Sequence, residues 1–250
     1  MALLGGVLWI LRFSSLFRIN SFQFLQKTPP EHSPLTLPLP PPDDLVALLQ
    51  KSLRNAGWWQ KLWGAQHFFS WPARYPASLL PPEFTSIAAE KHYKDHVLYL
   101  VVARRIPRAV WCFHTAPVPW CGWIDENGVL FRKALRADGN LIATIDDYAQ
   151  RQRPIGSTVL PRRIFSNLLS VLRVLHASPF SEYEIALRSV AKEEVEVNIP
   201  HGPRLLFSLR FPADGLEEVL RAAFYHEGAF ARAGKLQYLD FRVKDRVYYQ

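Results

Sequence analysis

Histidines and cysteines in two short segments have spacings that metal ligands use. His92 and His96 are four residues apart, which on a helix would bring both imidazoles to one zinc ion. The glutamate that follows the first histidine of a zincin motif is absent, and His96 begins an apolar run typical of a strand. Cys112, His114 and Cys121 offer three ligands without an evident fourth. We therefore expect no metal site and no cofactor.

The two cysteines, Cys112 and Cys121, leave two interpretations open. They could form a disulfide that spans the Pro117-Val118-Pro119 loop, provided that this part of the chain lies outside the cytoplasm. They could equally be two reduced, buried thiols.

Motifs for covalent or phosphate chemistry are missing from the sequence. It contains neither a Gly-x-Ser-x-Gly nucleophile turn nor a glycine-rich phosphate loop. The acidic pairs Asp146-Asp147 and Glu193-Glu194 each lie within one element, where neighbouring side chains on a strand point to opposite faces. We interpret both pairs as solvated surface and expect no catalytic residue.

Composition indicates a globular and basic protein. The 250 residues are 49% hydrophobic, which is ample for a core, and the net charge is +8. That charge suits an anionic membrane surface or a polyanion. No compact basic stripe with interleaved aromatic residues occurs, so nucleic acid is not an expected partner.

The chain begins with an apolar run, Ala2 to Leu11, that no charge interrupts. This run is shorter than the ~20 residues of a spanning helix, and it lacks the basic segment and cleavage site of a signal peptide. We interpret residues 1–18 as a membrane anchor whose beginning is missing. The alternative is a buried N-terminal helix of a soluble domain.

Residues 19–113 have the pattern of a small α+β domain. A strand pattern from Ile19 is followed by a proline-rich insertion, residues 28–42, and by a helix that Asp43 and Asp44 can cap. Residues 58–71 are rich in tryptophan and phenylalanine and predict either satellite core or a belt at a membrane interface. Two strands, residues 96–103 and 109–113, complete this domain.

Residues 119–250 predict a mostly antiparallel β-domain with two flanking helices. Asn127-Gly128 between apolar flanks indicates a hairpin, and Pro161 opens a helical repeat. Strand patterns cover residues 182–189, 194–199 and 205–211, and Asp214 can cap a last helix. The predicted fold class of the whole chain is α+β.

The last thirteen residues, 238–250, alternate apolar and polar side chains as one half-buried strand does. Such a strand is either an interior member of a sheet or an edge that exposes unpaired N–H and C=O groups. An edge can accept a strand from another protein.

In chain order, these features resemble the FtsQ/DivIB family of bacterial cell-division proteins. The resemblance is carried by the strand after the anchor and by three motifs: Arg105-x-Pro107-x-Ala109-x-Trp111, the hairpin at residues 124–131, and Tyr238-x-Asp240-x-Arg242. Members of this family have a membrane helix, a POTRA domain and a C-terminal β-domain. Arg104 stands where the family has glutamate, and the proline-rich insertion and the Trp-rich segment depart from its pattern.

The resemblance implies a single-pass, non-catalytic scaffold of the divisome in the cytoplasmic membrane, with most of the chain extracytoplasmic. Its partners would be small bitopic proteins like FtsB and FtsL, which add a strand near the closing strand; no small-molecule substrate is implied. The partner-binding residues by motif position are Tyr238, Asp240, Arg242, Val247, Tyr248 and Tyr249.

Two other functions remain open. The first is a POTRA-type chaperone or transport module that receives polypeptide by strand addition. The second is a basic cytoplasmic nucleic-acid-binding protein or hydrolase. A hydrolase would require His92, His96, Asp146 and Asp147 to converge in space.

Overall fold

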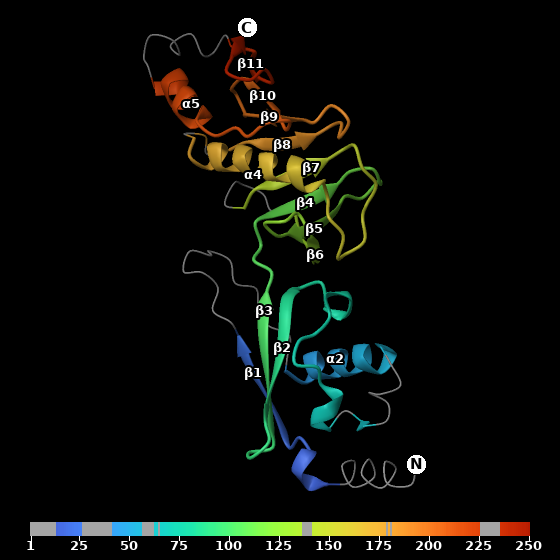
Figure 1. Cartoon of the computed structure of the whole chain (residues 1–250). Helices are drawn as coiled ribbons and strands as arrows, with labels where there is room; N and C mark the ends of the chain where they lie inside the picture. The colour runs from blue at the N-terminus through green and yellow to red at the C-terminus, as the bar shows by residue number, and fades with distance from the viewer. Residues whose placement is uncertain are drawn as a thin grey trace. The chain divides into compact units, whose positions relative to one another are not determined.

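The computed structural model of the chain describes residues 14–26, 42–56, 63–64, 66–136, 142–178, 180, 182–225 and 236–250. The chain divides into two compact units, Met1–Ile106 and Pro107–Gln250. Two sheets and three α-helices lie within the described residues (Figure 1). The predicted α+β class is therefore confirmed.

The first unit is a three-stranded sheet with one α-helix beside it. Strand order is β1-β3-β2, with β3 parallel to β1 and antiparallel to β2. Three short 3-10 turns join these elements. The bounds are η1 (Ser15–Phe17), β1 (Ser21–Gln26), α2 (Pro42–Ala56), η2 (Phe68–Ser70), η3 (Ala77–Leu79), β2 (Phe84–His92) and β3 (Val97–Arg104).

The core of this unit lies between α2 and the sheet. Leu45 and Leu49, four residues apart on α2, are buried on one helix face. Phe68 and Trp71 join the same cluster at 0% and 1% exposure. The described part of the Trp-rich segment therefore contributes core, one of the two alternatives that the sequence left open.

The predicted membrane anchor and the proline-rich insertion fall mainly on residues 1–13 and 28–41, which lie outside the described residues. Among the helices that the structure describes, none combines the length and the apolar character needed to cross a membrane.

The second unit is built on a nine-stranded sheet with the order β12-β11-β10-β9-β8-β7-β4-β5-β6. Most neighbours are antiparallel, as predicted; β4–β7, β7–β8 and β10–β11 are parallel. The bounds are β4 (Ala109–Phe113), β5 (Trp120–Ile124), β6 (Leu130–Ala134), β7 (Thr144–Asp147), β8 (Glu184–Leu187), β9 (Glu194–Asn198), β10 (Arg204–Ser208), β11 (Tyr238–Phe241) and β12 (Tyr248–Tyr249).

Two helices make the crossovers that parallel strands require. The chain passes from β7 to β8 through α4 (Arg162–His176), and from β10 to β11 through α5 (Leu216–Tyr225). Pro161 precedes α4, where its fixed φ suits the helix start. Figure 1 shows α4 lying along one face of the sheet.

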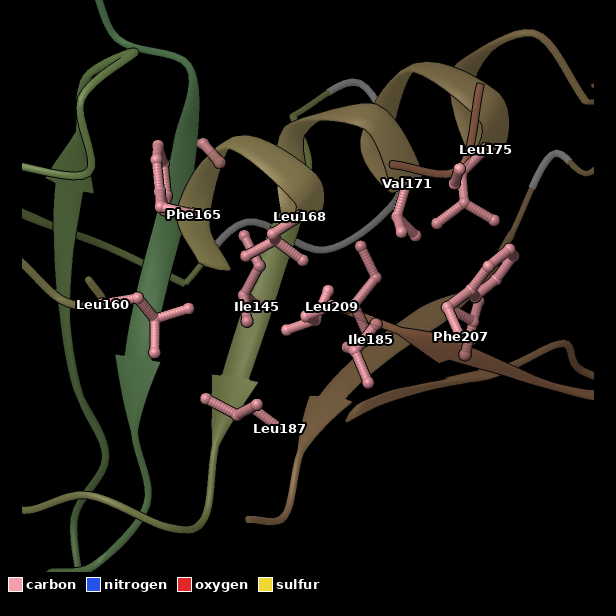
Figure 2. Close-up of a cluster of buried hydrophobic side chains, with 14 of the residues drawn as sticks. Ile145, Leu160, Phe165, Leu168, Val171, Leu175, Ile185, Leu187, Phe207 and Leu209 are labelled. Carbon is pink, nitrogen blue, oxygen red and sulfur yellow. The ribbon is translucent and has the colours of Figure 1, made fainter. Parts of the chain in front are cut away.

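The core of the second unit lies under α4. Apolar side chains at helical spacing on α4, among them Leu168, Val171 and Leu175, point toward the sheet (Figure 2). Ile145 and Ile185, opposite each other on β7 and β8, meet them with 0% exposure. Each fully buried side chain of this size stabilises the fold by roughly 1.5–3 kcal/mol.

Strand β4 belongs to the second unit, which corrects the predicted domain boundary at residue 113. All five of its residues are buried, because β5 and β7 flank it, the main core covers one face, and a smaller apolar cluster buries Val110 and Cys112 on the other. The Arg-x-Pro motif ends the pairing of β3, and Pro107 then starts the new unit. From sequence, β3 and β4 looked like consecutive strands of one domain because both are apolar.

The hairpin predicted at Asn127-Gly128 joins β5 to β6. The buried Asp125 side chain organises the turn: its Oδ1 accepts the N–H groups of Asn127 and Val129, both at 2.9 Å. Gly128 has φ of +71°, a conformation that glycine adopts at no steric cost.

A disulfide joins Cys112 and Cys121, which face each other across β4 and β5 with Cα atoms 4.0 Å apart. Both are buried with Val110 and Ala134 on the sheet face opposite α4. Of the two alternatives left open by the sequence, the structure has the disulfide.

Replacing Cys112 and Cys121 together by alanine should lower the free energy of unfolding by roughly 2–3 kcal/mol, because the bridge closes a short loop in the unfolded chain. Urea unfolding of the variant and the oxidised wild type measures the difference. Reductant should destabilise the wild type by a similar amount and leave the variant unchanged. A variant as stable as the wild type would contradict the prediction.

Candidate partner-binding edge

The six residues predicted to bind a partner lie together in one hairpin at the edge of the nine-stranded sheet. Tyr238 and Asp240 are on β11, Arg242 follows it, Val247 precedes β12, and Tyr248 and Tyr249 form β12.

The C-terminal segment folds as two strands rather than the single strand that was predicted. Strand β11 ends at Phe241, the chain reverses, and β12 returns antiparallel, with Leu239 opposite Tyr249 and Asp240 opposite Tyr248. Asp245 lies in this turn with φ of +59°, a left-handed conformation that aspartate tolerates better than most residues. In the sequence, every odd position from 239 to 249 is apolar except 245, which is aspartate. This break in the alternation is the sequence signal for the turn.

Antiparallel geometry fixes which backbone groups of β12 face outward. The Gln250 N–H donates to the Tyr238 carbonyl, and the Gln250 carbonyl accepts from the Gln237 N–H. Successive residues of a strand direct these groups to opposite sides, so the N–H and C=O of Tyr249 point away from β11. No described strand pairs with that outer side.

Both tyrosines of β12 have exposed side chains. Tyr248 is 47% exposed and Tyr249 is 73% exposed. Tyr248 shares the sheet face of Asp240, whereas Tyr249 shares the face of the buried Leu239. The edge therefore presents an aromatic ring on each side of an open backbone.

Asp240 and Arg242 pair with each other inside the domain. Arg242 Nε donates to Asp240 Oδ1 at 2.9 Å, and Nη2 donates to Oδ2 at 2.6 Å. Arg242 Nη1 donates to Glu194 Oε2 at 3.1 Å, which ties the hairpin to β9. The hydrogen bonds that Arg242 donates lower the pKa of the Asp240 carboxyl. The hydrogen bonds that Asp240 and Glu194 accept raise the pKa of the Arg242 guanidinium. These two motif residues position the edge.

Acid should therefore weaken the closing hairpin. Because the pKa of Asp240 is lower in the folded chain than in the unfolded one, its stabilisation is present at neutral pH. That stabilisation is lost as the pH falls below the ordinary carboxylate range, at about pH 4.

The difference in urea midpoint between wild type and Asp240→Asn should be large at neutral pH and shrink in acid. Asp214→Asn, which removes an exposed acid paired with Arg173, is the control. An Asp240→Asn difference that persists in strong acid would contradict this assignment.

A groove of about 460 Å³ lies beside the edge, between the start of α5 and the β11–β12 turn. Val219 and Val243 are exposed there, at 38% and 46%. Its remaining apolar lining is Phe211, Pro212, Leu216, Phe241 and Val247. Sequence reasoning did not find this groove, because it joins segments that are far apart in the chain, and helical spacing predicted Val219 to face inward.

A polar groove of about 340 Å³ lies beside β9 and β10 and is also lined by Arg242. Its charges are mostly paired: Arg188 Nε donates to Glu196 Oε2 at 2.9 Å, and Arg242 binds Glu194. The closing hairpin thus lines the apolar groove with its turn and contributes Arg242 to the charged one.

Asp146 and Asp147, predicted as solvated surface, are buried at 4% and 0% exposure. Asp146 accepts from Arg136 Nη1 at 2.8 Å and lies 2.6 Å from His114 Nε2. The prediction was wrong because β7 is a central strand: one face lies under α4 and Arg136 covers the other.

Asp147 lies on the α4 side of β7 and has its own partners. It accepts from Trp111 Nε1 at 3.0 Å and from the backbone N–H groups of Ala149 and Gln150, each at 2.9 Å. These bonds account for a fully buried carboxylate, since buried charges require such partners. Asp147 therefore fixes the end of β7.

The histidines that the sequence singled out lie in the first unit. The His92 ring packs against Tyr99, with centroids 4.7 Å apart, and His96 Nδ1 lies 3.0 Å from the Arg18 carbonyl. Asp146 and Asp147 belong to the second unit and point to opposite faces of β7. No group of three or more metal-binding side chains occurs among the described residues.

No protein-family model matches the chain, and no curated protein matches it.

Proposed function

We propose that this chain is a non-catalytic, membrane-anchored scaffold of the FtsQ/DivIB type. In this proposal residues 1–18 belong to the membrane anchor and the first unit is the POTRA-like domain. The second unit is the β-domain that recruits FtsB- and FtsL-like bitopic proteins by strand addition. The scaffold would couple early and late components of septation at the cytoplasmic membrane.

The observation that carries the proposal is the open edge at β12. It ends a large sheet, its outer backbone groups at Tyr249 have no described strand partner, and its two side chains are exposed tyrosines. Long open edges are hazards that proteins usually cover, so a short edge held in place by the Asp240–Arg242 pair suits a specific partner. In strand addition, backbone hydrogen bonds supply affinity and side-chain contacts supply selection.

Two further observations support the extracytoplasmic placement and the partner type. The Cys112–Cys121 disulfide is typical of an oxidising compartment. The apolar groove beside the edge could receive apolar side chains of the segment that adds the strand. Tyrosine is among the residues enriched at binding hot spots.

Amide hydrogen exchange on the full chain in nanodiscs tests the proposal. The probes are soluble extracytoplasmic segments of the FtsB- and FtsL-like proteins of the same organism. We expect a bound segment to protect the outward N–H of Tyr249, while the inward N–H of Gln250 serves as the internal control. No binding by either segment would overturn the function. Binding without protection at Tyr249 would overturn strand addition at β12.

A further inference from the structure

Three segments of the first unit meet where the described chain begins. The Ile19 N–H donates to the Gln66 carbonyl at 2.8 Å, and the Asn20 N–H donates to the His96 carbonyl at 2.8 Å. These bonds hold η1, the loop before η2 and the β2–β3 turn at one end of the unit. Figure 1 shows η1 and the β2–β3 turn at the same end of the three-stranded sheet.

Apolar and aromatic side chains from these segments form one outward surface. It consists of Leu16, Phe17, Phe69 and Tyr93 and is termed the aromatic surface. Leu16 is 65% exposed and Tyr93 is 43% exposed, while Phe17 and Phe69 are half-buried. The Phe17 ring stacks on Phe69 at 5.0 Å and meets the edge of Tyr93 at 6.1 Å.

Buried rings support this surface from below. Trp63, His67 and Phe68 are at most 7% exposed. Trp63 contacts Phe69 at 5.3 Å between centroids, and Phe68 contacts Tyr93 at 4.7 Å. The exposed rings are therefore fixed on a packed base, and clustered exposed apolar side chains are a feature of interaction sites.

Chain length places the aromatic surface close to the apolar run. Leu11, the last residue of that run, is five residues before Leu16. At a maximum of about 3.6 Å per residue, their Cα atoms are within roughly 18 Å of each other. The exposed cations Arg18 and Lys94 flank the aromatic surface, with one acid, Asp95, in the same turn. Aromatic rings and cations together are typical of residues at a membrane interface.

We propose that the aromatic surface rests in the headgroup layer of an anionic bilayer and fixes the first unit against it. The inference depends on the proposed membrane anchor. We assign a bilayer as the binding partner of this surface for two reasons: the apolar run is connected to it by only a few residues, and cations accompany its aromatic rings.

Depth-dependent quenching on the full chain in vesicles of phosphatidylcholine and phosphatidylglycerol tests the inference. A fluorophore is attached at Lys94→Cys, next to Tyr93; the bridged native cysteines do not react. The control label is at Ser86→Cys, exposed at the far end of β2, roughly 25 Å away at about 3.4 Å per residue. Lipids with a nitroxide at the headgroup should quench the label at residue 94 several-fold more than the label at residue 86.

Leu16→Gln should reduce the quenching at residue 94, because it places an amide where an apolar side chain meets the membrane. Leu25→Gln, at a 47% exposed position at the far end of β1, should leave it unchanged. Equal quenching of the labels at residues 94 and 86 in vesicle-bound protein would overturn the inference. So would quenching at residue 94 that Leu16→Gln does not reduce. Neither result would contradict the proposed membrane anchor. Failure of the full chain to sediment with vesicles would overturn both the inference and the anchor.

Discussion

Replacing Tyr248 and Tyr249 together by alanine will abolish binding of the FtsB- or FtsL-like partner and leave the chain folded. At about 2 kcal/mol for each hot-spot side chain, the loss is about 4 kcal/mol, or roughly a thousandfold in Kd. Folding is spared because the two side chains are 47% and 73% exposed and their backbone is retained. Titration calorimetry with the partner segment, and urea unfolding without it, measure the two effects.

Tyr148→Ala is the matched control for this variant. Tyr148 is 46% exposed, against 47% for Tyr248, and lies just after β7. Strand β7 is five strands from β12 in the sheet, roughly 24 Å at about 4.8 Å per strand. Partner binding should be unchanged in this control. Unimpaired binding by a folded Tyr248/Tyr249 double variant would show that the partner binds elsewhere.

A proline at position 249 separates the contribution of backbone hydrogen bonds to partner affinity from that of the tyrosine side chain. Tyr249→Pro removes the outward N–H, which makes no bond to β11, so an edge strand should tolerate it. If a partner adds a strand, this variant should bind at least about tenfold more weakly than Tyr249→Ala, which keeps the N–H. Equal binding by the two variants would mean that the partner reads only the side chains.

Gly128→Ala should strongly destabilise the second unit. A Cβ at position 128 would lie 2.9 Å from Cδ2 and Cγ of the buried Phe165 ring, and φ there is +71°. The left-handed backbone costs about 1–2 kcal/mol and overpacking costs about 1–3 kcal/mol, so we expect a loss of roughly 2–5 kcal/mol. Chemical unfolding at equilibrium measures it.

Gly215→Ala isolates the packing part of that loss. Gly215 has a similar φ of +88°, but an added Cβ meets no atom within 4 Å. Its substitution should therefore carry only the backbone cost. If Gly128→Ala and Gly215→Ala destabilise the chain equally, the turn does not pack on Phe165 as tightly as the structure indicates.

The sequence determined the elements whose signals are local. Helical spacing after Pro161 predicted α4, and Asn127-Gly128 predicted the hairpin between β5 and β6. Both rest on interactions within a few residues, namely the 3.6-residue period of a buried helix face and the φ that a tight turn requires. The six residues of the candidate edge were named by their motif positions in the FtsQ/DivIB resemblance, and they lie within the last thirteen residues.

Tertiary structure decided the features that depend on distant neighbours. Parallel pairing of β7 with β4 and β8 buries Asp146 and Asp147, although adjacent acids alone indicate surface. The same contacts assign β4 to the second unit, because an apolar strand carries no sign of which sheet will pair with it. The groove at Val219 and Val243 likewise exists only because α5 returns the chain beside β10. Burial and pairing are properties of the assembled sheet, so local periodicity has no information about them.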